Sequence, residues 1–201
     1  MVARKTRRQV TVTHEADEIR FTIVYDGPAV ANGRMPLFDI APAMLSTAQL
    51  VEDGIRFLYG NDAALTIEVN ADFRRGSFAF EVFTSPDTLH HAQGLIAALT
   101  PQQLDLGLKL LGIGGSGGLI GFIKWLRGRT IQRIDKQGDQ AVVTVRDGNN
   151  ITINASVVNL ALNNNIRRDA DGVVAPLRSP GIEEFRAQLP GAPATVVEKM
   201  R

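Results

Sequence analysis

The chain has 201 residues, of which 44% are hydrophobic and 21% charged, the composition of an ordinary globular protein. This composition excludes an intrinsically disordered chain, and the absence of cysteine excludes disulfides, thiol catalysis and cysteine-based zinc sites. The 22 basic and 21 acidic residues nearly cancel, so contact with nucleic acid or an anionic membrane would need a local basic patch.

The N-terminal part of the sequence predicts a basic segment, a strand and a long helix. Residues 1–18 carry four positive charges in their first eight positions, and no apolar signal-like run follows, so we expect a cytoplasmic protein. Ile19–Tyr25 is rich in β-branched and aromatic residues and predicts a strand. Leu37–Tyr59 has apolar residues at helical spacing and predicts a helix, in which Pro42 is tolerated if Asp39 is the N-cap.

A β-hairpin and a further helix are predicted next. Leu65–Val69 and Ser77–Val82 alternate in period two around residues 72–76, a pattern typical of two antiparallel strands. Ser85 then has the character of an N-cap, with Pro86 at the first helical position, and leads into a helix over Leu89–Leu99.

The middle of the chain predicts two helices separated by glycines. Thr100 and Gln103 have the spacing of a capping box, which starts a helix through Leu104–Leu111. Six glycines lie between positions 112 and 121, and a second helix is expected over Leu119–Leu126. We therefore expect a helical hairpin with a glycine-rich turn.

The C-terminal part predicts shorter elements. Three strands are expected, followed by a helix over Ser156–Ile166: Arg129–Asp135, Ala141–Val145 and Ile151–Asn154. Four prolines then break the chain into short pieces, with a helical turn or two predicted at Gly181–Leu189 and a strand at Thr195–Val197.

The order of these elements predicts an α+β fold in which antiparallel β-hairpins pack with helices around the glycine-rich helical hairpin. We divide the chain into four parts: the basic segment and first strand at 1–18, an α+β unit at 19–129, β-hairpins and a helix at 130–175, and a proline-rich segment at 176–201.

The glycine cluster also matches a dinucleotide-binding fingerprint. Gly112, Gly114 and Gly117 have the spacing G-x-G-x-x-G, and Asp135 lies where an acid that binds a ribose could follow. Such a site needs a strand before the first glycine, whereas Leu104–Leu111 has no β-branched residue and follows a capping box. A nucleotide-binding enzyme or sensor is therefore an alternative that depends on this one element.

A second interpretation gives the same glycines a packing role. Gly114 and Gly118 are four residues apart, as are Gly117 and Gly121, and this spacing favours close contact between helices. Residues 110–127 could alternatively perturb a membrane, although the uncharged run of 110–123 is shorter than the roughly 20 residues that a spanning helix needs.

The segment after the glycines combines the only tryptophan with three cations: Lys124, Trp125, Arg127 and Arg129. Cations near a helix C-terminus interact favourably with the helix dipole, which is sufficient to explain them. They could also form an anchor for a protein, for phosphates of nucleic acid or for the surface of a membrane.

No catalytic set is visible elsewhere, which favours a non-enzymatic role. His90 and His91 are adjacent and cannot easily share one metal ion, and His14 is the only other histidine. The carboxylates show no spacing that marks an acid–base pair, so we expect no cofactor and no metal.

Several runs of sequence together resemble a family of bacterial proteins without an assigned activity. They are Phe21–Gly27, Asp39–Leu45, Arg75–Phe78, Gly118–Arg129, Asp147–Ile153 and Ala175–Phe185. The resemblance implies a further β-rich part after Thr195–Val197, so we expect this chain to be short relative to that family. It transfers no catalytic residue.

Together these observations predict an interaction or assembly module of a bacterial or mobile-element system, with a phage or defence association as a hypothesis. We expect it to self-associate or to dock a protein partner through the glycine-rich hairpin. The residues expected at that surface are Gly114, Gly117, Gly118, Gly121, Lys124, Trp125, Arg127 and Arg129.

Overall fold

The computed structural model describes residues 18–70, 77–86 and 99–199 and has an α+β fold with two antiparallel sheets. The larger sheet has five strands in the order β2-β3-β1-β7-β8. Their bounds are β1 Ile19–Asp26, β2 Leu65–Asn70, β3 Phe78–Pro86, β7 Glu184–Gln188 and β8 Thr195–Glu198. The expected α+β class is thus confirmed, and the last two strands complete the sheet that the first three begin.

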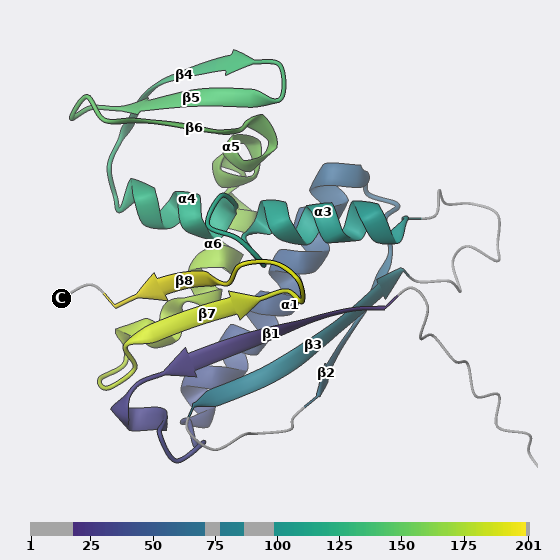
Figure 1. Ribbon diagram of the computed structural model, residues 1–201, viewed down its shortest axis with the longest axis vertical. Helices are drawn as coiled ribbons and strands as arrows, with labels where there is room; N and C mark the ends of the chain where they lie inside the picture. The colour runs from purple at the N-terminus through teal and green to yellow at the C-terminus, as the bar shows by residue number, and fades with distance from the viewer. Residues whose placement is uncertain (1–17, 71–76, 87–98, 200–201) are drawn as a thin grey trace, which may run out of the picture.

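The smaller sheet has three strands in the order β4-β5-β6 and lies at the opposite end of the molecule (Figure 1). Its strands are β4 Ile131–Gln137, β5 Gln140–Val145 and β6 Asn150–Asn154. Ala141, Val143 and Val145 of β5 are buried, whereas the alternate residues are half-buried. This alternation, together with turn residues between the strands, made all three predictable from sequence.

Within the described residues, six helical elements fill the space behind and between the sheets. They are α1 Leu37–Tyr59, α3 Pro101–Leu111, α4 Leu119–Leu126, α5 Ala155–Leu162, α6 Asn164–Val173 and the short 3-10 helix η2 Ala175–Arg178; a further 3-10 turn, η1 Pro28–Val30, follows β1. In Figure 1, α1 lies behind the five-stranded sheet, and α3 and α4 run across the molecule between the two sheets.

One face of the five-stranded sheet forms the core against α1. Phe21, Ile23 and Tyr25 of β1 are almost fully buried, and so are alternate residues of β3 and β7. The hydroxyl of Tyr25 donates a 2.7 Å hydrogen bond to the carbonyl oxygen of Val173 at the end of α6. The sheet is therefore fixed to α6 by a polar contact as well as by apolar packing.

Glycines allow the helices to cross α1 at close range. A Cβ atom at Gly54 of α1 would collide with the side chain of Leu111 in α3. One at Gly107 of α3 would collide with Ile55 of α1, and one at Gly172 of α6 would collide with the side chain of Ser46. Both helices that cross α1 thus depend on a missing side chain at the contact.

The start of α1 differs from the prediction. Asp39 is not the N-cap: the helix begins at Leu37 after Pro36, and Pro42 lies inside it. The carboxylate of Asp39 instead accepts a 3.1 Å hydrogen bond from the hydroxyl of Ser179, which is 140 residues away in the chain. A long-range contact has thus replaced the local cap.

The predicted helix start at Ser85 is also wrong. Ser85 and Pro86 lie on β3, where they pair with Thr66 and Leu65 of β2. Pro86 is the last residue of that strand and lies beyond Thr84, the last β3 residue that pairs with β1, so it is paired only with β2. The connection 72–76 and residues 87–98 of the expected helix over Leu89–Leu99 lie outside the described residues, as does the N-terminal segment up to residue 17.

Two further corrections concern the C-terminal part. The single helix predicted over Ser156–Ile166 is two helices, because Asn163 adopts an extended conformation and its side chain caps α6 by accepting from the N–H groups of Asn165 and Ile166. The helical turns predicted at Gly181–Leu189 are the strand β7, which pairs with β1.

A buried carboxylate lies between α1 and α6. Asp169 is 3% exposed, and Oδ2 has no hydrogen-bond partner among the described residues. Its Oδ1 is 3.7 Å from Nε of Arg168, which is largely exposed. Burial raises the pKa of Asp169, and the charge of Asp53 on α1 adds to the rise, whereas Arg168 opposes it.

We predict that Asp169→Asn raises the free energy of unfolding at pH 7. An acid with a raised pKa in the folded state binds its proton more tightly there, so it lowers stability as pH rises from about 4 through the raised pKa. The amide removes this cost, and its advantage should shrink toward pH 4. Thermal unfolding followed across this pH range measures the effect; a lower midpoint at pH 7 would show that the contact with Arg168 outweighs the desolvation.

Candidate functional site

The first glycine of the cluster ends α3. Gly112 has a left-handed backbone (φ 92°) and donates its N–H to the carbonyl of Lys109, while Ile113 donates to the carbonyl of Leu108. These two bonds form a Schellman motif, in which glycine is favoured because it has no Cβ atom. Thr100 and Gln103 form the predicted capping box at the other end of the helix.

The next glycines are needed for packing within the chain. A Cβ atom at Gly118 would collide with backbone atoms of Gly112 and Lys109, and one at Gly121 with the backbone of Ser116. Gly114 is buried against Leu189, whereas Gly117 is exposed with open space around it. Of the four glycines expected at a docking surface, only Gly117 is exposed.

A threonine of the last strand holds the glycine turn. The hydroxyl of Thr195 in β8 donates to the carbonyl of Gly115 (2.7 Å) and accepts from its N–H (3.1 Å). Thr195 is 1% exposed, so these bonds are shielded from water. They fix the turn, and with it the start of α4, beside β8.

The alternative nucleotide site lacks the element that it requires. The residues before Gly112 form the helix α3 and not a strand, and the 11 residues of α3 begin at Pro101. Asp135 lies on β4 and accepts a 2.7 Å hydrogen bond from Arg133. The geometry therefore gives no support to a dinucleotide fingerprint at Gly112, Gly114 and Gly117.

The apolar run around the glycines is mostly part of the core. Figure 1 shows α3 and α4 roughly end to end and not folded back on each other as a hairpin. Leu111, Ile113, Leu119, Ile120 and Phe122 are each at most 3% exposed. No helix within 18–70, 77–86 and 99–199 is both long and apolar enough to cross a membrane.

Two of the residues expected as an anchor at the end of α4 are engaged within the chain. The ring of Trp125 stacks on that of Phe122, with centroids 6.0 Å apart. Arg129 lies over the Trp125 ring at 5.8 Å and pairs with Asp147 at 3.2 Å. The pKa of Asp147 is lowered, first by a hydrogen bond from the backbone of Asn149 and also by the charge of Arg129.

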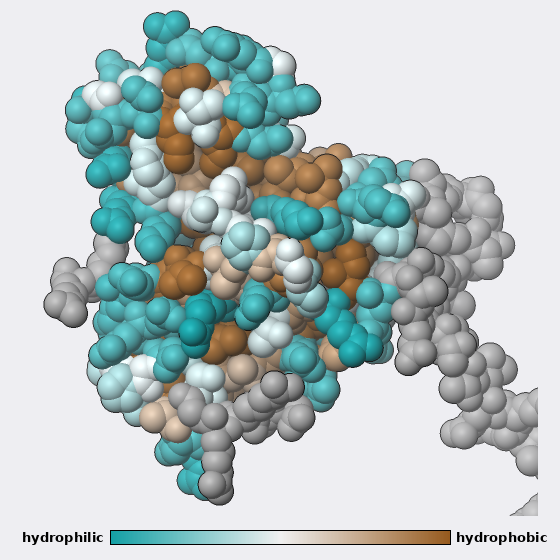
Figure 2. Space-filling model, viewed as in Figure 1, coloured by the Kyte–Doolittle hydropathy of each residue, from teal (hydrophilic) through white to brown (hydrophobic). Residues whose placement is uncertain are grey.

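A cleft of about 400 Å³ opens beside this end of α4. Its apolar wall comes from four elements: Ile120 and Ile123 of α4, Ala170 and Val174 of α6 and its C-cap, Leu177 of η2 and Val197 of β8. In Figure 2, hydrophobic surface is visible between α4 and β8. The volume suits one or two side chains or a small ligand.

The rim of the cleft is mainly basic. Four cations line it, against two carboxylates: Lys124, Arg127, Arg178 and Lys199, with Asp171 and Glu198. Lys124 donates to the carbonyl of Val196 (3.2 Å) and Lys199 to that of Ser179 (2.7 Å). In the described part of the chain, neither Arg127 nor Arg178 has a hydrogen-bond or ion-pair partner for its guanidinium group.

Arg127 has an unfavourable backbone conformation. Its φ of 43° lies in the left-handed region, and no other non-glycine residue in the described ranges has a positive φ. The residue is the C-cap of α4, a position at which glycine is the favoured residue, and Gly128 follows it directly. An arginine is thus held, exposed and unpaired, where a residue without a side chain would be less strained.

A second, polar cavity of about 460 Å³ adjoins the first across the same end of α4. Lys124 and Arg127 line both cavities, and Trp125, Arg129, Asn149 and Asn150 line only the second. The four residues that the sequence singled out at 124–129 therefore lie together, and Arg127 lies between an apolar and a polar hollow.

The cations and apolar residues contributed by α6, η2 and β8 were missed by sequence reasoning. Arg178 and Lys199 lie more than 50 residues from α4 and carry no local motif. Their positions depend on the pairing of β7 with β1 and β8 with β7, which was not predicted.

The described residues contain no group of three histidine, aspartate or glutamate side chains that could hold a metal ion. His14, His90 and His91 lie outside the described ranges.

No protein-family model matches the chain, and neither a curated protein nor a solved structure is significantly similar to it.

We predict that two neighbouring glycines differ sharply in their tolerance of alanine. Gly118→Ala would place a Cβ atom against the backbone of Gly112 and should lower the free energy of unfolding by at least about 2 kcal/mol. Gly117→Ala meets no atom and should change it by less than about 0.5 kcal/mol. Urea unfolding of both variants tests this, and equal losses would contradict the packing described for the turn.

Proposed function

We propose that the protein is a non-enzymatic docking module, active in the cytoplasm, that binds a segment of a protein partner in the cleft beside the end of α4. The single observation that carries the proposal is the apolar cleft whose basic rim includes two arginines without partners in the described structure. Of the residues that the sequence predicts at the docking surface, Lys124 and Arg127 line this cleft, and they face the opposite wall formed by α6, η2 and β8.

The composition of the cleft supports an acidic segment with one apolar anchor residue as its occupant. The apolar wall would bury an aliphatic or aromatic side chain, which at about 25 cal/mol per Å² is the main source of affinity. The excess of two cations on the rim would favour carboxylates on either side of that anchor. A peptide of this kind matches both features, whereas a purely apolar or a basic peptide matches at most one.

The strained backbone of Arg127 favours a docking role over a simple role in capping the helix. A cation near a helix C-terminus interacts favourably with the dipole by about 0.3–1 kcal/mol wherever it lies in the last turn. That benefit does not require the left-handed position, where a side chain costs about 1–2 kcal/mol. Strain of this size at an exposed, unpaired arginine supports a role in binding.

We predict that Arg127→Gly weakens peptide binding about tenfold, or ~1.4 kcal/mol, without a loss of stability. Glycine removes the left-handed strain, which offsets the chain entropy that it adds to the unfolded state. Peptides would first be selected on the full-length protein from a random phage-displayed library. Fluorescence anisotropy would then give Kd for wild type and variant, and thermal unfolding would give their stability.

Arg178→Ala should weaken the same peptides from the opposite wall, whereas Arg167→Ala is the matched control. Arg167 is an exposed arginine of α6 that does not line either cavity. Affinity should fall as salt rises, because the rim charges are exposed. Selected peptides without acidic residues, or an unchanged Kd in both Arg127→Gly and Arg178→Ala, would overturn the proposal.

A further inference from the structure

The first three turns of α1 carry an apolar face that contacts no other described residue closely enough to be buried. Leu37, Phe38 and Leu45 are 71%, 93% and 60% exposed, and Ala41 and Pro42 between them are also exposed. The exposed face of a surface helix is normally polar. Five adjacent apolar residues on such a face therefore indicate a surface that another molecule covers.

The exposed side chains of this face supply about half of the area that one partner contributes to a standard interface. A fully exposed leucine or phenylalanine presents roughly 150–200 Å², so Leu37, Phe38 and Leu45 expose roughly 400 Å² together. A standard interface buries about 800 Å² on each partner. Three side chains thus supply about half of what a stable dimer needs, before Ala41, Pro42 and the surrounding backbone are included.

The order of residues along the face points to a second copy of this chain as the occupant. Leu37, Ala41 and Leu45 form a row with a spacing of four residues, and the row reads the same in both directions. When two such rows run antiparallel about a two-fold axis at Ala41, Leu37 of each copy meets Leu45 of the other. The small alanine at the crossing point lets the helices approach closely, as in the packing of i±4 ridges.

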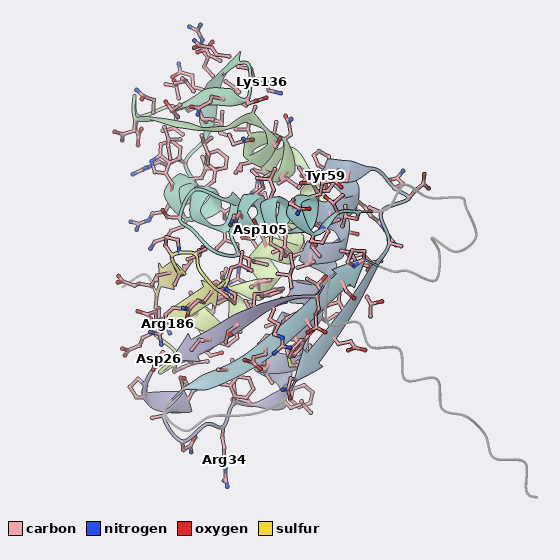
Figure 3. All side chains as sticks on the ribbon, turned by 45° about the vertical axis from the view of Figure 1, so that its right-hand side comes forward. Asp26, Arg34, Tyr59, Asp105, Lys136 and Arg186 are labelled. Atoms are coloured by element: carbon pink, nitrogen blue, oxygen red, sulfur yellow. The ribbon has the colours of Figure 1, made fainter. Side chains whose placement is uncertain are left out.

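Charge also favours self-contact. The five residues carry no charge, so two copies bring no like charges together across the axis. The nearest carboxylate on the helix, Asp39, is half-buried and bonded to Ser179, and Glu52 farther along is paired with Arg56 at 2.8 Å. Arg34, which precedes the helix, projects away from the body of the protein (Figure 3).

We propose that the protein forms a two-fold dimer through this face of α1, with the crossing point at Ala41. The face shares no residue with the cleft, so dimerisation and peptide docking can be tested separately. An isologous contact of this type closes on itself and gives a dimer without further growth.

Substitutions that introduce a charge at the two-fold axis test the proposal. Wild type is expected to be a dimer by sedimentation velocity, and Ala41→Glu and Ala41→Lys each to be monomers, because each places like charges at the crossing point. An equimolar mixture of the two variants should restore the dimer, since opposite charges then meet. Gln49→Glu, an exposed position one turn beyond the row, should remain a dimer.

A monomeric wild type at all accessible concentrations, a dimer that persists in both charged variants, or a mixture that stays monomeric would each overturn the proposal. Single-cysteine variants give a second measurement that does not depend on added charge. The chain has no cysteine, so Ala41→Cys should form an intermolecular disulfide on mild oxidation and Gln49→Cys should not. Equal cross-linking of the two would also overturn it.

Discussion

The structure depends on the close approach of two helices to α1. Side chains of Leu111 and Ile55 occupy the space left at Gly54 and Gly107, so α1 and α3 each fill a gap in the other. Gly172 does the same for α6 where it faces Ser46. Because protein interiors are close-packed, an added Cβ atom at these crossings would have to push aside the side chain of Leu111, Ile55 or Ser46 that occupies the space. The position of α3 is thereby fixed against the core, and α3 in turn fixes the start of the glycine turn.

The glycine turn determines where the cleft forms, because it sets the position of α4. Gly112 ends α3, Gly118 lets α4 begin immediately against it, and Thr195 binds Gly115 from β8. These contacts bring the end of α4 beside β8, where Lys124 bonds to Val196, 72 residues later in the chain. The cleft therefore exists only when β7 and β8 have completed the five-stranded sheet. Ion pairs near the surface contribute little to this arrangement. Asp26 at the end of β1 and Arg186 in the middle of β7, for example, form a half-buried pair at 3.0 Å (Figure 3).

The sequence was sufficient where local patterns decide the structure. The helix over Leu37–Tyr59 and the helix over Leu119–Leu126 have the predicted bounds, because apolar periodicity and terminal glycines mark them. Prediction from the sequence was wrong where pairing between distant segments determines the secondary structure. Glu184–Gln188 has no strong strand preference and becomes β7 because β1 offers an unpaired edge, and Ser85 is drawn into β3 by its pairing with β2.

The candidate site likewise has a part that the sequence predicts and a part that depends on long-range pairing. Lys124, Trp125, Arg127 and Arg129 are visible in the sequence as a basic aromatic cluster, and the structure places them together at the end of α4. The sequence does not show which of these four residues have partners within the chain and which do not. This difference follows from the β5–β6 turn, which supplies Asp147 to Arg129, and from the left-handed conformation that leaves Arg127 free. The opposite wall follows from long-range pairing alone.

Ser179 connects the cleft with the apolar face of α1. Its hydroxyl donates to Asp39, one residue after Phe38, and its carbonyl accepts from Lys199 on the rim of the cleft. If two copies join through α1, both clefts are therefore held at a fixed relation to the dimer axis by short hydrogen-bonded paths. A partner with two acidic segments would then bind the second cleft at an effective concentration set by its own linker, and its avidity would exceed the affinity of either cleft alone. Each cleft can therefore bind its acidic segment weakly and the complex can still assemble, because the dimer presents two clefts to the same partner.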